Sequence, residues 1–198
     1  MSSFDGFAQL ERDGWARRTT VAAYVNKFAP VTDAIAGEMV AAAPALDGMN
    51  VLDLCCGQGS LSALALAAGA RVTGVDLSQE MLSLARSAAP GADLRQADAS
   101  QLPFPDASFD VVFCNFGMMH LPDRGKGLAE VARVLRPGGR FLMSTWAAPD
   151  ASPAFGIAFG AIRGHADMSR APAQPDFFQF ARPDEASSLF EAAGLAPV

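Results

Sequence analysis

Hydrophobic residues in this chain fall either in short continuous runs or in stripes of helical spacing. The segment from Phe109 to Cys114 is apolar apart from Asp110, which is typical of a strand buried on both faces of a parallel sheet. Between such runs, apolar residues recur every three or four positions, as they do on one face of a helix. The pattern predicts strands at residues 49–55, 71–75, 93–97, 109–114 and 141–146.

Start and stop signals predict the helices that separate these strands. Ser78 is a good N-cap after the second strand, and Pro137-Gly138-Gly139 ends the helix before the fifth. Pro183 and Gly194 bracket a last helix, whose first turn is acidic. The expected helical segments are 1–48, 59–69, 78–89, 122–135 and 183–194.

Strand and helix alternate five times, so we expect an α/β fold with a doubly wound, mostly parallel sheet. A single domain is expected, with an N-terminal helical cap at 1–48 and the sheet core at 49–147. Residues 148–198 would form a C-terminal cap and acceptor region that ends in the last core helix. Residues 147–182 are rich in Pro, Gly and Phe, and their weak periodicity predicts no defined element.

The composition excludes some kinds of binding partner and site. The net charge of −6 argues against broad binding of nucleic acid or anionic membranes, because both need clustered Lys and Arg. The sequence has no run of about 18 apolar residues to span a membrane and no signal-peptide core, so we expect a cytoplasmic protein. Cys55, Cys56 and Cys114 show neither disulfide nor zinc spacing, so a metal site is not expected and the cysteines are interpreted as small hydrophobic residues.

Acidic residues and glycines gather where three of the predicted strands end. Gly57 and Gly59 leave the backbone after the first strand open to a ligand, and Asp76 ends the second strand. Asp53 lies near the end of the first strand and Asp98 follows the third. Ligands of an open parallel sheet bind at the carboxyl ends of its strands, so the three acids should converge. Asp76 suits ribose hydroxyls, and its alternative is a plain surface acid. Asp98 suits an adenine amino group, and its alternative is an N-cap. Asp53 suits an ammonium group, and its alternative is to brace the loop.

Five ordered motifs carry a resemblance to a known family. They are Val51 to Gly59; Gly74-Val75-Asp76-Leu77-Ser78 with Met81; Ala97-Asp98-Ala99 followed by Leu102-Pro103-Phe104; Phe109-Asp110-Val111-Val112; and Arg133 to Arg140. In these motifs the chain resembles the class I S-adenosylmethionine-dependent methyltransferases, in the small-molecule branch related to the ubiquinone/menaquinone C-methyltransferases. The resemblance covers residues 20–147 and, more weakly, 183–194. It implies a Rossmann-like fold, S-adenosylmethionine as cofactor, and transfer of a methyl group to a small-molecule acceptor by in-line displacement.

The resemblance also implies roles for single positions around the cofactor. Asp53 and the turn from Cys55 through Gly57 to Gly59 would hold the methionine part. Asn115 and Phe116 would lie beside the methionine amine and the reactive methyl, and Tyr24 would reach the cofactor carboxylate.

Around the adenosine part, the resemblance implies a second set of contacts. Asp76 would accept from the ribose hydroxyls, and Leu77 and Met81 would flank the adenine ring. Asp98 and the backbone of Ala99 would bind the adenine edge.

The sequence departs from the family pattern in two places. The family usually has Gly where Cys55 stands, which makes the first turn tighter here. The family also has a final pair of strands after the helix at 183–194, and this sequence lacks it, so either the chain is a fragment or an edge of the sheet is left open. An open sheet edge invites pairing with another chain, and a homodimer through that edge is therefore an expectation.

The sequence indicates less about the methyl acceptor than about the cofactor. His120 is a candidate general base, and its alternative is a plain turn residue before Leu121-Pro122. Seven aromatic residues would either line a pocket for an apolar or aromatic acceptor or pack as a cap on the sheet: Trp15, Trp146, Phe155, Phe159, Phe177, Phe178 and Phe180.

Two other functions remain open from the sequence. A non-catalytic module that binds S-adenosylmethionine would show the same cofactor motifs. An NAD-dependent oxidoreductase would share the glycine turn and the acid at Asp76, but it expects Gly-x-Gly-x-x-Gly/Ala, and Ser62 stands at the last position.

Overall fold

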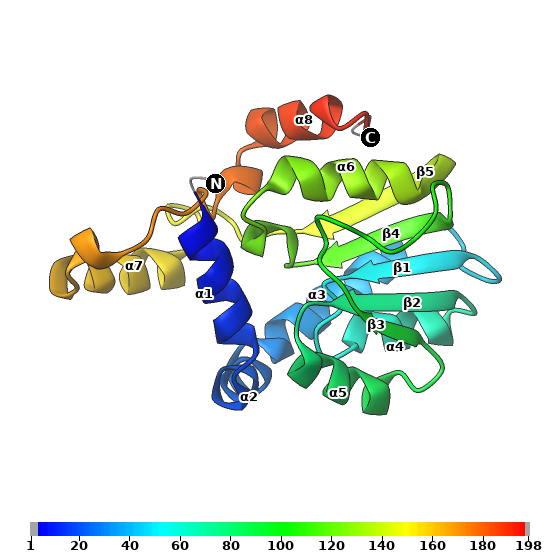
Figure 1. Ribbon diagram of the computed structural model, residues 1–198, viewed down its shortest axis with the longest axis horizontal. Helices are drawn as coiled ribbons and strands as arrows, with labels where there is room; N and C mark the ends of the chain where they lie inside the picture. Colours follow the sequence, from blue (N-terminus) through cyan, green and yellow to red (C-terminus); the bar gives the residue numbers. More distant parts are fainter. Residues whose placement is uncertain (1–3, 197–198) are drawn as a thin grey trace.

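The computed structural model describes residues 4–196, and its centre is a five-stranded sheet between two layers of helices (Figure 1). The strand order is β3-β2-β1-β4-β5, and every neighbouring pair is parallel. The predicted doubly wound α/β fold is therefore confirmed. The strands are β1 (Asn50–Leu54), β2 (Arg71–Asp76), β3 (Asp93–Gln96), β4 (Phe109–Asn115) and β5 (Leu135–Ser144).

The helices divide into two covering layers and a group at one end of the sheet. In Figure 1, α3, α4 and α5 lie below the sheet and α6 and α8 above it, while α1, α2 and α7 lie at the end toward which the strand arrows point. The helices are α1 (Asp5–Trp15), α2 (Arg18–Lys27), α3 (Ala29–Ala42), α4 (Ser60–Ala67), α5 (Gln79–Ala88), α6 (Arg124–Val134), α7 (Pro153–His165) and α8 (Pro183–Ala192). Short 3-10 turns lie at Met118–His120, Met168–Arg170 and Gln179–Ala181.

The alternation of side chains along the central strands builds one hydrophobic core on each face. Val111 and Phe113 of β4 pack with residues of α3 and α4, whereas Val112 and Cys114 pack with residues of α6. Successive residues of a strand point to opposite faces, so a strand covered on both sides must be apolar at nearly every position. This explains the continuous apolar run at 109–114.

Several helix ends lie where the sequence predicts them. The backbone N–H of Met81 donates to Ser78 Oγ at 3.1 Å, so Ser78 is the N-cap of α5 as expected. The last helix begins at Pro183, and Gly194 just beyond it adopts the left-handed conformation (φ 81°). These ends depend on neighbours within a few residues, which is why the sequence alone locates them.

Two predictions for the second half of the chain need correction. β5 starts at Leu135, directly after α6, instead of at residue 141, because Leu135 pairs with Phe109 before the register shifts to Arg140 opposite Val111. Helix α7 was not predicted; none of its residues is buried, so its sequence carries no helical stripe of core residues.

β5 forms one edge of the sheet, and β3 forms the other. Among residues 4–196, β4 is the one strand paired with β5. Within the same residues, no helix is both long and apolar enough to cross a bilayer.

Candidate functional site

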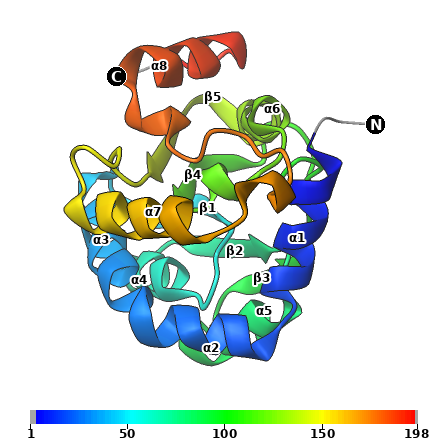
Figure 2. The ribbon, with the colours of Figure 1, turned by 90° about the vertical axis from the view of Figure 1, so that its left-hand side faces the viewer.

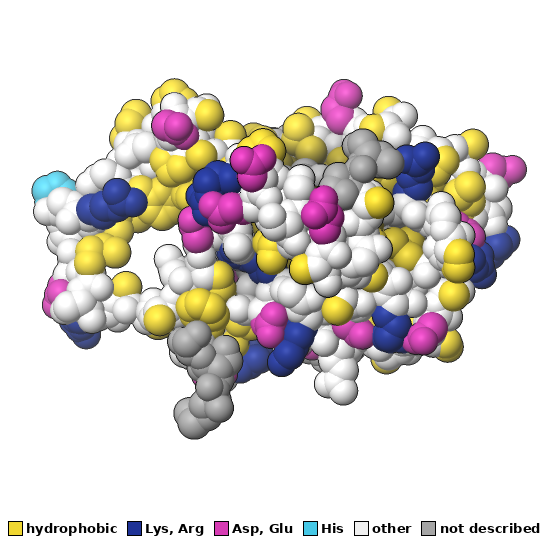
Figure 3. All heavy atoms as spheres, turned by 90° about the horizontal axis from the view of Figure 1, so that it is seen from above, with side chains coloured by type: hydrophobic (Ala, Val, Ile, Leu, Met, Phe, Trp, Pro, Cys, Tyr) yellow, Lys and Arg dark blue, Asp and Glu magenta, His cyan; other side chains and the backbone are white. Residues whose placement is uncertain are grey.

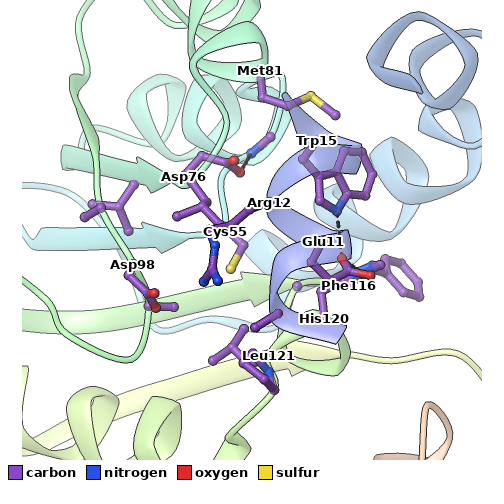
Figure 4. Close-up of a pocket in the computed structure, with 18 of the residues that line it drawn as sticks. Glu11, Arg12, Trp15, Cys55, Asp76, Met81, Asp98, Phe116, His120 and Leu121 are labelled. Atoms are coloured by element: carbon purple, nitrogen blue, oxygen red, sulfur yellow. Dashed lines mark hydrogen bonds and ion pairs between the residues drawn. The ribbon is translucent and has the colours of Figure 1, made fainter. Parts of the chain in front are cut away.

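A cavity lies at the carboxyl ends of the strands, between the sheet and the N-terminal helices (Figure 4). It holds about 920 Å³ of space, part of which is continuous with solvent. Eleven of the thirteen residues singled out from the sequence line it: Tyr24, Cys55, Gly57, Asp76, Leu77, Met81, Asp98, Ala99, Asn115, Phe116 and His120.

Asp53 and Gly59 are not among the residues that line this cavity, and their expected contact with a ligand stays a prediction. Asp53 is 1% exposed, and Ser62 Oγ donates to its Oδ2 at 2.6 Å. Burial raises the pKa of Asp53 to about 7, although the hydrogen bond from Ser62 opposes this. Gly59 is the N-cap of α4, and a Cβ there would lie 2.9 Å from Ala85 of α5. Both residues hold the turn in place from beneath.

Asp76 ties the end of β2 to the turn after β1. Its Oδ2 accepts a hydrogen bond from the Gly57 N–H at 2.9 Å, and its Oδ1 accepts one from the Ser78 N–H at 2.8 Å. Burial raises the pKa of Asp76 above its usual value, and the two backbone donors oppose the rise. A carboxylate has about four lone-pair sites, so acceptor capacity remains for a ligand in the cavity.

Asp98 caps a turn and also lines the cavity. Its Oδ1 accepts from the N–H and the Oγ of Ser100, at 2.8 and 2.7 Å, so it caps the following turn. Among residues 4–196, no group bonds to its Oδ2, and Asp98 lines the cavity. The turn therefore orients the side chain while one oxygen stays available to a donor.

The polar groups at the end of β4 are bonded to the protein itself. Asn115 donates to the Thr32 carbonyl at 2.9 Å and accepts from Ser144 Oγ at 2.7 Å. The Tyr24 hydroxyl donates to Thr32 Oγ1 at 3.2 Å, and burial raises the pKa of Tyr24. These bonds join the β4 end to α2 and α3, while Asn115 keeps a second amide hydrogen and the Tyr24 hydroxyl keeps its acceptor lone pairs.

The cavity also contains residues of α1, and the sequence did not single out three of them: Ala8, Glu11 and Arg12. Ala8, Glu11, Arg12 and Trp15 line it, and Arg12 is the one Lys or Arg among the described lining residues. Their spacing of three and four residues puts them on one helix face. That spacing was readable from the sequence, but nothing local in it shows that α1 packs over the strand ends.

Part of the chain matches a known family of proteins. Residues 52–143 match the family described as "Methyltransferase domain". A demethylmenaquinone methyltransferase of Clavibacter sepedonicus is 42% identical over 105 residues, which is 52% of this chain and 43% of that protein. Residues 52–143 therefore carry a methyltransferase domain, and the chain is similar to the class I S-adenosylmethionine-dependent methyltransferases. This similarity sets aside the NAD-dependent oxidoreductase alternative.

Other methyltransferases match a larger part of the chain. A 27-O-demethylrifamycin SV methyltransferase of Amycolatopsis mediterranei is 34% identical over 154 residues, covering 71% of this chain and 55% of that protein. The crystal structure of a putative methyltransferase from Bacillus halodurans superposes with a TM-score of 0.63 at 26% identity, over 81% of this chain and 68% of that chain. The chain thus spans about half the length of the two curated methyltransferases.

The donor and acceptor set of the cavity fits the cofactor of this methyltransferase family, S-adenosylmethionine. Two carboxylates line it at neighbouring strand ends, and Leu77 and Met81 add apolar surface. The turn at Gly57 (φ 53°) brings backbone close to the cavity without a side chain.

Proposed function

We propose that this chain binds S-adenosylmethionine in the cavity and transfers its methyl group to a small apolar acceptor. The observation that carries the proposal is the convergence of Asp76 and Asp98, from two neighbouring strands, on one cavity that also contains the glycine turn. A hydroxyl-rich, amino-bearing nucleoside matches acceptors placed in this way.

Each end of the cofactor would meet different residues. Asp76 would accept from the ribose hydroxyls, Asp98 and the Ala99 backbone would bind the adenine edge, and Leu77 and Met81 would flank the ring. All five residues line the cavity. The guanidinium of Arg12 would pair with the cofactor carboxylate, since planar guanidinium groups bind carboxylates with two parallel hydrogen bonds.

For methyl transfer from a sulfonium, the protein needs to do little more than position the acceptor and the methyl group. The cofactor supplies an activated methyl group and a neutral leaving group. The protein must hold the acceptor in line with the breaking bond, and such positioning contributes roughly 7–11 kcal/mol.

A closed circuit of aromatic contacts supports an apolar or aromatic acceptor. Neighbouring rings in the circuit have centroids between 5.2 and 6.5 Å apart. We call this set the aromatic collar: Trp15, Tyr24, Phe28, Trp146, Phe155, Phe178, Phe177 and His120. Phe116 lines the cavity and contacts Trp146 at 4.2 Å, so the aromatic collar adjoins the cofactor site.

The other predicted acceptor aromatics lie at or beyond the edge of the aromatic collar. Phe159 stacks on Phe155 at 6.0 Å. Phe180 is buried and stacks on Phe190 of α8, so it belongs to the core on the α6 face and not to an acceptor pocket. Seen from above the sheet, the surface is hollowed near one end and hydrophobic side chains border the hollow (Figure 3).

Calorimetry and a labelled-methyl assay test the proposal together. We expect S-adenosylmethionine to bind with one site per chain, NAD to show no heat, and Asp76→Ala to abolish most of the binding. Transfer of a tritiated methyl group to one of a panel of phenols, quinols and thiols should follow. Tight binding without transfer to any acceptor would favour the non-catalytic binding module, and absence of binding would refute the proposal.

A homodimer through the β5 edge stays a separate prediction. Pairing of two copies along this edge would satisfy backbone groups of β5 that have no strand partner among residues 4–196. Sedimentation equilibrium of the chain, with a Pro substitution at Leu142 in β5 as the variant, distinguishes dimer from monomer, because Pro removes a backbone donor.

A further inference from the structure

His120 is paired with an acid from the opposite end of the chain. Its Nδ1 lies 2.9 Å from Oε2 of Glu11, which is 109 positions earlier in sequence and belongs to α1. His120 ends the 3-10 turn that follows β4, at the cavity wall (Figure 4). The contact therefore joins the N-terminal helix to the strand end beside which an acceptor would lie.

The acid and the imidazole ring are both held in place. Trp15 Nε1 donates to the same Glu11 Oε2 at 2.9 Å, which fixes the carboxylate within α1. Edge-to-face contacts with Trp15 at 5.6 Å and Phe177 at 5.8 Å hold the ring of His120 from two sides. The side chains of His120 and Glu11 are 31% and 23% exposed, so proton exchange with solvent remains open.

The pairing decides which ring nitrogen is a base. A carboxylate accepts hydrogen bonds and does not donate them, so the neutral imidazole keeps its proton on Nδ1 and presents a lone pair on Nε2. Fixing the tautomer in this way is how a carboxylate orients a catalytic histidine in unrelated enzymes. The other charged groups that line the cavity around His120 are Arg12 of α1, Asp76 of β2 and Asp98.

We propose that Glu11 is a positioning residue that holds His120 as the general base for a hydroxyl acceptor, a proposal that rests on the function proposed above. In the step, the acceptor oxygen forms a bond to the methyl carbon while the carbon–sulfur bond breaks and its electron pair stays on sulfur. The hydroxyl proton passes to Nε2 of His120 and later to solvent. A hydroxyl acceptor needs such a base, whereas one that is already ionised does not.

Nitrogen-15 NMR of the two imidazole rings tests the pairing without any acceptor. The chain has two histidines, so a His165→Gln background leaves His120 as the sole signal. At about pH 9, where free imidazoles are neutral, we expect the Nδ1–H tautomer to predominate, and Glu11→Ala to shift the population to Nε2–H. Glu38→Ala, which removes an exposed glutamate of α3, is the matched control and should leave the tautomer unchanged. A wild-type ring in the Nε2–H form overturns the proposal.

Two phenols test the base itself. At about pH 8, 4-nitrophenol is largely ionised and 4-methylphenol is not. We expect Glu11→Ala and His120→Ala to slow methyl transfer to 4-methylphenol by roughly 10²-fold or more and to change transfer to 4-nitrophenol little. The rate with 4-methylphenol should recover in both variants as the pH rises toward the ionisation of the phenol.

The outcomes separate this proposal from the function on which it rests. No binding of S-adenosylmethionine by the wild type in calorimetry refutes the proposed function, while the tautomer measurement still decides the pairing. Binding with equal losses for both phenols in Glu11→Ala indicates a purely structural role for Glu11 and overturns the proposal. So does binding without transfer to either phenol.

Discussion

Cys55 packs against Gly117, and the contact leaves no space for a side chain at position 117. A Cβ atom there would lie 2.5 Å from Cβ of Cys55 and 2.8 Å from Sγ of Cys114. Cys55 itself adopts φ 58°, in the left-handed region where glycine is favoured. The cysteine that departs from the family pattern is therefore accommodated by a glycine in the segment after β4.

A double-mutant cycle at this contact should show strong coupling. We expect Gly117→Ala to lower the free energy of unfolding by about 1–3 kcal/mol, because the added methyl group overlaps Cys55 and Cys114. Cys55→Gly should change it by less than about 1 kcal/mol, since relief of the left-handed strain offsets the greater entropy of the unfolded chain. The double variant should recover part of the loss in urea denaturation. Additive effects would contradict the contact.

The buried carboxyl of Asp53 should make stability depend on pH. The pKa of Asp53 is about 7 in the folded chain and near 3.9 when unfolded. Between these values the folded chain holds a proton that the unfolded chain has released, so the free energy of unfolding falls as the pH rises from about 4 to 7 and levels off above.

Asp53→Asn should remove this slope, which amounts to up to about 4 kcal/mol. Urea denaturation at several pH values measures it. Asp110→Asn is a control of opposite sign: the hydrogen bond from Arg136 lowers the pKa of Asp110, so its stabilisation is present at neutral pH and is lost as the pH falls. A difference between wild type and Asp53→Asn that is constant with pH would show that Asp53 is not buried as a carboxylic acid.

Replacing Asp76 and Asp98, the two carboxylates at the strand ends, should weaken cofactor binding to different extents. We expect Asp76→Asn to lower affinity for S-adenosylmethionine by about 10- to 100-fold, because it loses acceptors for both the ribose and the turn. Asp98→Asn keeps an oxygen for Ser100 and should cost about tenfold. Asp93→Asn, at the other end of β3, is the control and should bind as the wild type does in calorimetry. Unaltered affinity in Asp76→Asn would contradict the assignment of the ribose site.

Arg124 should hold the segment after α7 onto the body of the protein. Arg124 is 4% exposed, and its guanidinium donates to the carbonyl of Asp176 at 2.6 Å, to Gln179 at 2.8 Å and to the carbonyl of Met119 at 3.1 Å. Arg124→Met leaves these acceptors unbonded, so we expect unfolding to become easier by about 2–4 kcal/mol.

Limited proteolysis gives a second readout for this residue. Cleavage within residues 147–182 should become faster in Arg124→Met, whereas Arg163→Met, on the exposed surface of α7, should leave it unchanged. Equal cleavage in all three proteins would show that the segment is held by other contacts. Figure 2 shows this segment, coloured yellow to orange, passing in front of the strand ends, where its release would open the acceptor side.

Sequence reasoning performed best where structure is decided locally. The apolar run at 109–114, the N-cap at Ser78 and the bracket of Pro183 and Gly194 each depend on a few neighbouring residues, and each predicted its element. It failed at β5, whose start is decided by pairing of Leu135 with Phe109, and at α7, which buries no residue. Pairing partners and exposed helices leave no periodic signal in the chain.

The amino-acid sequence by itself determined the parallel sheet and the place of Asp76 and Asp98 at its carboxyl edge, because strand periodicity and strand direction bring these residues to one side. Only the tertiary structure decided that Asp53 is buried against Ser62 beneath the turn, and that α1 brings Glu11 to His120. Those contacts arise from the packing of segments distant in sequence, and such packing depends on the shapes of whole surfaces instead of on the order of neighbouring residues.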